Sequence, residues 1–143
     1  QPTLPQPVEH DLEELVRTVH ESGITVSFVR TGETRPLPVG VGNAIYRICQ
    51  EALTNSLKHA GPHAEITILL QTTDAALILQ VYDDGRGAAA PFDGKGHGLV
   101  GMAERAAAFG GTVISGPRPS GGFRVIASIP IPHPDNSLRS PYE

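Results

Sequence analysis

The sequence predicts an α+β domain, a two-layer α/β sandwich with about three helices on one face of a mixed, mostly antiparallel sheet. Two observations favour this class. Helical and strand patterns are interspersed along the chain, and two pairs of strand patterns are each separated by only a short turn. With 143 residues, the chain has the length of one domain with a sizeable core.

The first part of the chain predicts a linker, a helix and a strand. Residues 1–7 are rich in proline, and we expect them to be a linker remnant. In Val8–Glu21 apolar residues recur at helical spacing, and Gly23 follows the pattern as a stop signal. Ile24–Arg30 predicts a strand.

The longest helical pattern covers Val39–Ala60 and ends at Gly61-Pro62, which together stop a helix. On a helix with about 100° per residue, the apolar residues share one broad side. They are Ile45, Ile48, Cys49, Ala52, Leu53 and Leu57. The residues on a narrow arc opposite are Arg47, Glu51, Asn55 and Lys58.

The next elements are two strands joined by a short polar turn, Ala64–Gln71 and Ala76–Asp83. A glycine-rich loop follows, and then a helix, Leu99–Phe109, which ends at a pair of glycines.

Two strand patterns, Thr112–Ser115 and Phe123–Pro130, complete the predicted sheet. We expect residues 8–131 to form the domain and the polar segment 132–143 to be a disordered tail.

Composition excludes several classes of protein. The net charge of −4 without a Lys/Arg cluster argues against nucleic acid as a direct partner. The single cysteine excludes an internal disulfide and a cysteine-based zinc site, so we interpret Cys49 as a core residue. No apolar run has the length of a membrane span, and because the chain begins with Gln1 we expect a fragment of a longer protein.

The first candidate site is the stretch DDGRG, Asp83–Gly87, at the end of an apolar strand. A buried carboxylate at Asp83 would select a ligand with an exocyclic amine, such as adenine, and repel the carbonyl of guanine. Gly85 and Gly87 would let the backbone approach a flat ligand closely. The alternative is an ordinary strand-ending Asp-Gly turn.

The second candidate site is GKGHGLVGM, Gly94–Met102, which leads into the helix that begins near Leu99. Free backbone N–H groups at a helix N-terminus, flanked by small residues, suit an anion such as phosphate. His97 could contact phosphate or be solvated. The alternative is a surface loop before a capped helix.

The third candidate site is the row Glu51, Asn55 and Lys58 on the long helix. An amide oxygen at Asn55 is a hard ligand suited to Mg²⁺, and Lys58 could offset phosphate charge. Glu51 could orient or deprotonate a water bound to the metal. The alternative is a solvated face with an (i, i+4) polar pair.

Taken together, these three stretches resemble the catalytic ATP-binding domain of two-component sensor histidine kinases, within the superfamily of gyrase, heat-shock chaperone, histidine kinase and MutL. The similarity runs from about Leu12 to Pro130. YRICQEALTNSLKHA resembles the family's N box, DDGRG its first glycine box and GHGLVGMAERA its second. The residues of these motifs resemble those of the nitrate- and desaturase-sensor-like subfamily. The resemblance implies the Bergerat ATP-binding fold.

The resemblance implies a role for each matching residue. Asn55 would be the Mg²⁺ ligand, Asp83 the adenine acceptor, and Lys58 and His59 would approach the phosphates. Glu51 matches the acid of the N box. The residues that would contribute to the nucleotide site around the two glycine boxes are Gly85, Gly87, Gly96, His97, Gly98, Leu99 and Gly101.

The resemblance also implies partners that lie outside this chain. The histidine-bearing dimerisation helices usually stand just upstream, and Pro2, Pro5 and Pro7 forbid a long helix around His10. We therefore expect Mg·ATP binding and transfer of the γ-phosphoryl to a histidine on a separate domain, for relay to a response regulator. We expect a cytoplasmic location, with an inner-membrane sensor left open for a longer parent protein.

Two alternatives remain at this stage. One is an ATP-hydrolysing machine of the gyrase or chaperone type, although the predicted lid, Arg86–Gly98, is shorter than theirs. The other is a non-catalytic nucleotide-binding regulatory module.

The sequence departs from the family pattern at Phe123, where many relatives carry threonine near the adenine.

Overall fold

A computed structural model describes residues 8–85 and 99–132 of the chain. Within these ranges it contains three helices and five strands. Their bounds are α1 Val8–Glu21, β1 Thr25–Thr31, α2 Val41–His59, β2 Glu65–Thr72, β3 Ala76–Asp83, α3 Leu99–Ala107, β4 Thr112–Pro117 and β5 Phe123–Pro130. The expected tail and linker lie almost wholly outside the described residues, so the domain boundaries stay a prediction.

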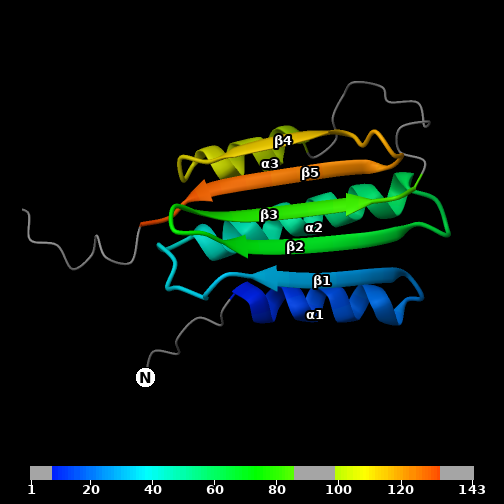
Figure 1. Cartoon of the computed structure of the whole chain (residues 1–143), viewed down its shortest axis with the longest axis horizontal. Helices are drawn as coiled ribbons and strands as arrows, with labels where there is room; N and C mark the ends of the chain where they lie inside the picture. The colour runs from blue at the N-terminus through cyan, green and yellow to red at the C-terminus, as the bar shows by residue number, and fades with distance from the viewer. Residues whose placement is uncertain (1–7, 86–98, 133–143) are drawn as a thin grey trace, which may run out of the picture.

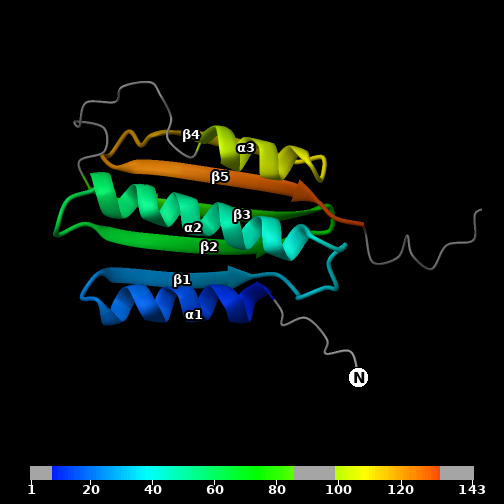
Figure 2. The ribbon, with the colours of Figure 1, turned by 180° about the vertical axis from the view of Figure 1, so that it is seen from behind.

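The strands form one sheet in the order β1-β2-β3-β5-β4, and all three described helices cover the same face of it (Figure 1). Seen from behind, α2 lies between α1 and α3 across the middle of the sheet (Figure 2). β1 and β2 are parallel, while the other three neighbouring pairs are antiparallel. The predicted two-layer α+β sandwich is therefore confirmed.

The connections explain this mixture of directions. β2–β3 and β4–β5 are hairpins with short turns, which require antiparallel pairing. β1 and β2 are separated in sequence by the whole of α2, and this helix carries the chain back so that β2 can run parallel to β1.

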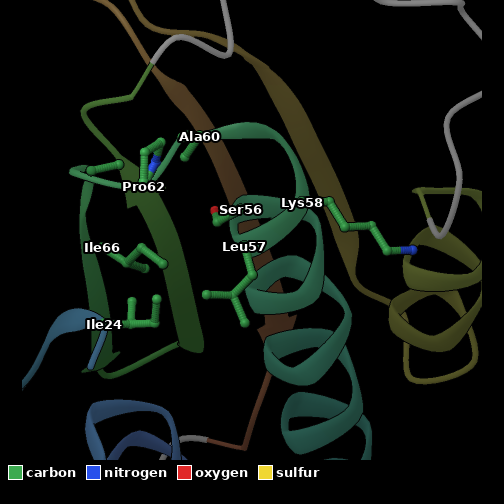
Figure 3. A pocket seen from close by; sticks show the side chains of 9 residues that line it. Ile24, Ser56, Leu57, Lys58, Ala60, Pro62 and Ile66 are labelled. Carbon is green, nitrogen blue, oxygen red and sulfur yellow. The ribbon is translucent and has the colours of Figure 1, made fainter. Parts of the chain in front are cut away.

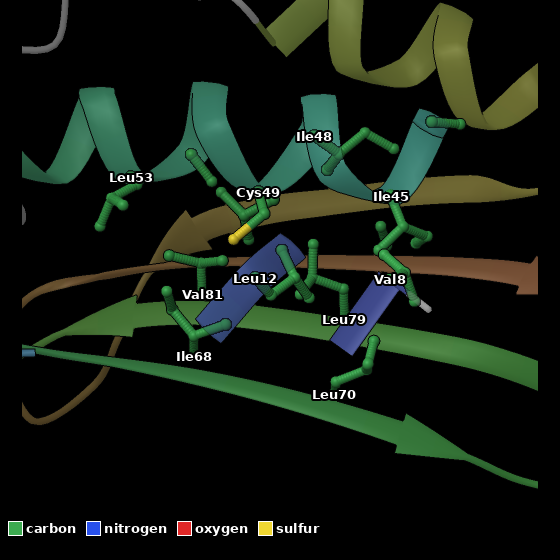
Figure 4. Close-up of a cluster of buried hydrophobic side chains, with 14 of the residues drawn as sticks. Val8, Leu12, Ile45, Ile48, Cys49, Leu53, Ile68, Leu70, Leu79 and Val81 are labelled. Atoms are coloured by element: carbon green, nitrogen blue, oxygen red, sulfur yellow. The ribbon is translucent and has the colours of Figure 1, made fainter. Parts of the chain in front are cut away.

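The core lies between α2 and the central strands, because side chains alternate in and out along β2 and β3. From the sheet, Ile68, Leu79 and Val81 point toward the helices, and Ile48 and Cys49 of α2 point down to meet them (Figure 4). The prediction that Cys49 is a core residue is confirmed, since its side chain has no exposed area.

Every predicted element is present, with bounds that differ by at most two residues at either end. The start of α2 has a clear physical reason. Gly40 has a φ of 91°, in the left-handed region, so the helix begins at Val41 and not at the expected Val39. Val39 is left outside the helix with 97% of its surface exposed.

The end of β1 requires glycine for both conformation and space. Gly32 has a φ of 83°, and a Cβ built on it would overlap the backbone carbonyl oxygen of Thr72 at the end of β2. Gly116 in β4 is the opposite case: its φ is not positive, and a Cβ there would meet no heavy atom within 4 Å among the described residues.

We therefore expect Gly32→Ala to lower the free energy of unfolding by about 1–3 kcal/mol or more, because the strained φ and the overlap both oppose the folded state. Gly116→Ala is the matched control and should change it by less than about 0.5 kcal/mol. Urea unfolding followed by circular dichroism measures both. Equal stability of the two variants would contradict this account of the turn.

A second prediction concerns the buried thiol. Burial raises the pKa of Cys49 to about 12, because the thiolate would lose its hydration. At pH 8 only about one thiol in ten thousand is ionised. Native protein should therefore resist a thiol-specific reagent and react only after addition of denaturant, as a colorimetric thiol assay would detect. Rapid reaction of the folded protein would contradict the buried position.

Candidate functional site

The candidate site is centred on Asp83, the last residue of β3. Residues at alternate positions of β3 face the helices, and Asp83 continues the inward series after Leu79 and Val81. Its carboxylate is therefore buried on the helix side of the sheet, with 2% of the residue exposed. The adenine contact predicted for Asp83 requires a buried carboxylate, and the structure provides one.

Both carboxylate oxygens of Asp83 accept a hydrogen bond from the protein. The Ser56 hydroxyl of α2 donates to Oδ2 at 2.8 Å, and the backbone N–H of Gly85 donates to Oδ1 at 3.0 Å. Because buried carboxylates are costly unless donors surround them, these two bonds stabilise the group at this position. The carboxylate still has lone pairs that could accept from a ligand.

The β4–β5 turn holds the backbone beside the same residue. Arg118 donates from Nη1 to the carbonyl oxygen of Asp83 at 2.8 Å, and its guanidinium carbon lies 4.7 Å from the centre of the Tyr82 ring. The contact over the ring is a cation–π interaction. The last residues of β3 are thus fixed from a third element in addition to α2 and the sheet.

Two glycines allow these elements to approach. A Cβ on Gly85 would overlap the backbone of Ala60 at the end of α2, and a Cβ on Gly122 would overlap the carbonyl of Asp83. Gly122 also has a φ of 92°. Sequence reasoning assigned Gly85 to close approach of a ligand, whereas its Cβ position faces the protein's own helix end.

The row of polar residues on α2 lies on the side of the helix that faces α3. In Figure 3 the Lys58 side chain extends away from the other drawn side chains and toward α3. Glu51 and Asn55 share this face because they precede Lys58 by seven and three residues. Glu51 and Asn55 are half-buried, while Lys58 and His59 are exposed.

One part of the α2 prediction is wrong. Leu57, expected on the apolar side, is 43% exposed, and its neighbour Ser56 is buried instead, with 8% exposed. The buried stripe runs through Ala52, Ser56 and Ala60 at intervals of four residues. Sequence reasoning missed Ser56 because it followed apolar character, although this spacing could have identified it.

Leu57 borders a cavity at the end of α2, and Lys58 also contributes to its lining. The cavity has a volume of about 360 Å³, and Ser56, Ile24, Pro62 and Ile66 also line it (Figure 3). It lies between the last turn of α2 and the starts of β1 and β2. Although Ser56 is buried, the cavity leaves free space beside its side chain.

The remaining predicted site residues divide into two groups. Leu99 begins α3 and packs against the core, and a Cβ on Gly101 would meet no heavy atom within 4 Å among the described residues. The structure thus gives no steric reason for glycine at 101. Gly87, Gly96, His97 and Gly98 lie outside the described residues.

No cluster of three or more His, Cys, Asp or Glu side chains that could hold a metal exists in the described part of the chain. A magnesium ion at Asn55 would therefore need further oxygen ligands from a nucleotide and water, which is how Mg²⁺ is usually bound. None of the helices within residues 8–85 and 99–132 has the length and apolar character needed to cross a bilayer.

Comparison with known proteins agrees with this geometry. Residues 40–133 match the family described as histidine kinase-, DNA gyrase B-, and HSP90-like ATPase. The chain is 36% identical over 123 residues to the signal transduction histidine-protein kinase/phosphatase DegS of Brevibacillus brevis, covering 84% of this chain and 31% of DegS. It is 34% identical over 108 residues to the sensor histidine kinase LnrJ of Bacillus subtilis. This match covers 76% of this chain and 26% of LnrJ.

The chain thus spans less than a third of the length of these two relatives. Its fold is similar to that of the catalytic domain of histidine kinase ThkA, with a TM-score of 0.67 and 16% identity, over 87% of this chain and 90% of that one. The match of the family model to most of the described domain, over the helix and strands that build the Asp83 site, shows that the chain belongs to the family of histidine kinase-, DNA gyrase B-, and HSP90-like ATPases.

Proposed function

We propose that this chain is the ATP-binding catalytic domain of a sensor histidine kinase. It binds ATP with Mg²⁺ and donates the γ-phosphoryl to a histidine on a separate dimerisation domain, for relay to a response regulator. The observation that carries the proposal is the buried, doubly hydrogen-bonded carboxylate of Asp83 in a chain of this ATPase family. The sensor histidine kinases DegS and LnrJ support the kinase assignment within that family.

Asp83 recognises the base. Since Ser56 and Gly85 already donate to its oxygens, the carboxylate presents only lone pairs to a ligand. The exocyclic amino group of adenine can donate to them, whereas the carbonyl of guanine would place two acceptors together. A buried acceptor left facing another acceptor loses affinity strongly, so this geometry favours ATP over GTP.

Asn55, Lys58 and His59 serve the phosphate end. When bound, Mg²⁺ neutralises phosphate charge and orients the transferred group. Asn55 supplies an amide oxygen to that ion, and exposed Lys58 and His59 approach the phosphates. Gly87, Gly96, His97, Gly98 and Gly101 contribute to the lid and the helix after it.

In the transfer, an imidazole nitrogen of the acceptor histidine forms a bond to the γ-phosphorus. The bond from that phosphorus to the bridging oxygen breaks, ADP leaves with the electron pair, and the imidazole gives up its N–H proton. This chain mainly positions the phosphates and stabilises their charge. Glu51 has an orienting role in that arrangement, because the acceptor domain can provide the base.

ATP hydrolysis of the gyrase type is the second candidate, because the family that matches includes DNA gyrase B and HSP90. In that case Glu51 would act as general base on water. The similarity to the sensor kinases DegS and LnrJ favours phosphotransfer. We infer a cytoplasmic location for this domain.

The base assignment predicts that Asp83→Asn weakens ATP binding about 10- to 100-fold, because a charged acceptor facing the amino group is lost. Wild type should bind ATP more tightly than GTP. Isothermal titration calorimetry measures both affinities, with circular dichroism to check folding. Equal affinity of the wild type for ATP and GTP would refute this role for Asp83.

The metal assignment predicts that Asn55→Ala removes the gain in ATP affinity that Mg²⁺ gives to the wild type, while affinity without Mg²⁺ stays within about threefold. Asn43→Ala is the matched control, since Asn43 is an exposed amide in the first turn of the same helix. Calorimetry with and without Mg²⁺ distinguishes them. An unchanged Mg²⁺ response in Asn55→Ala would remove Asn55 from the metal site.

The kinase assignment predicts an acid-labile, base-stable phosphohistidine when the domain is mixed with ATP, Mg²⁺ and a histidine-bearing dimerisation domain. ATP binding without phosphohistidine would instead support a non-catalytic nucleotide-binding module. Steady ATP hydrolysis by the domain alone would support the gyrase-type reading.

A further inference from the structure

We infer that Ser56 is a positioning residue for base selection: its hydroxyl fixes the Asp83 carboxylate so that the group accepts from an amino-bearing base. This inference rests on the proposed nucleotide site and deepens it. Its basis is the hydrogen bond from Ser56 Oγ to Asp83 Oδ2 at 2.8 Å, which joins two buried residues from different elements.

The burial of this pair is unusual for the chain. Among the described residues, the polar or charged ones that are buried are only Glu9, Ser56 and Asp83. Two of these three are bonded to each other. Ser56 occupies a buried position of α2 where an apolar side chain would avoid the cost of burying a polar group. Its hydroxyl is satisfied there by the carboxylate of Asp83 at the end of β3.

The two donors on Asp83 act differently on its orientation. Gly85 is two residues along the same loop and bonds Oδ1, so that bond alone leaves the second oxygen unfixed. The terminal torsion of an aspartate is broad, and the carboxylate could turn about it. Ser56 comes from α2 and holds Oδ2, so the plane of the carboxylate is fixed between the helix and the loop.

Ser56 also connects the base to the phosphate end of the site. It directly follows Asn55 in the last turns of α2, and the backbone of Ala60 lies against Gly85. The helix segment that would present the metal ligand therefore also sets the orientation of the base acceptor. A residue that acts in this way should affect recognition of the base more than binding of the triphosphate.

The test compares ATP with inosine triphosphate, which carries a carbonyl in place of the amino group of adenine. We expect Ser56→Ala to weaken ATP binding about tenfold, because the carboxylate loses its second fixed oxygen, and to change inosine triphosphate affinity less than about twofold. The preference for ATP should fall accordingly. Thr54→Ala is the matched control, since its hydroxyl bonds the Gln50 carbonyl on the exposed side of α2.

A second pair of variants isolates the hydroxyl from the volume of the side chain. Ser56→Thr and Ser56→Val add similar bulk, and the cavity beside Ser56 has space for it. Thr keeps the donor and should retain the ATP preference, whereas Val removes it and should behave like Ser56→Ala. This pair also gives the answer if Ser56→Ala does not fold.

Equal losses for ATP and inosine triphosphate in Ser56→Ala or Ser56→Val would show a packing role and overturn the inference. So would an unchanged ATP preference in both variants, or the same loss in Thr54→Ala. Failure of the wild type to bind ATP is a separate outcome, because it refutes the proposed function itself before any variant is compared.

Discussion

The buried carboxylate of Asp83 is the constraint on which the site depends. It lies at the end of a central strand, beneath the last turn of α2, and it has 2% of its surface exposed. A charge in this position is stable only if donors reach it, and they come from Ser56 on the helix and Gly85 in the loop. Removing the carboxylate would leave both donors in the interior without their acceptor.

The surrounding elements are shaped by the same constraint. Arg118 from the β4–β5 turn bonds the carbonyl of Asp83, and glycine at 85 and 122 lets backbone segments approach where any Cβ would overlap. The strand end, the helix end and the turn are held together by close backbone approaches, by the Ser56–Asp83 hydrogen bond and by the Arg118 side chain. These contacts hold the Asp83 carboxylate in one position among three elements.

Much of the fold could be predicted because local patterns match the tertiary structure. β3 alternates along its whole length, and α2 has a continuous apolar stripe, so their positions follow from periodicity. Asp83 could also be predicted, since a carboxylate directly after an apolar strand continues the inward series. The start of α2 could not, because the apolar pattern does not show that Gly40 adopts a left-handed conformation, beside the Phe109 ring.

Ser56 shows the limit of reading hydrophobic character alone. Leu57 is the more apolar residue, yet the helix turns Ser56 toward the sheet and leaves Leu57 at the rim of a cavity. The buried residues along the whole of α2 determine which side of the helix faces the sheet. A single apolar residue near its end cannot rotate the helix. Only the position of Asp83 in space reveals why a hydroxyl is tolerated in the buried stripe.

The parallel pairing of β1 with β2 bears on how the molecule assembles. β1 lies at the edge of the sheet and bonds only one strand, and the whole of α2 lies between β1 and β2 in the sequence. The hairpins β2–β3 and β4–β5 need only short loops to close, whereas β1 requires closure of a long one. Because β3 and β5 are also far apart in the sequence, we expect the two hairpins to form before the long-range pairings β1–β2 and β3–β5 that join them into one sheet.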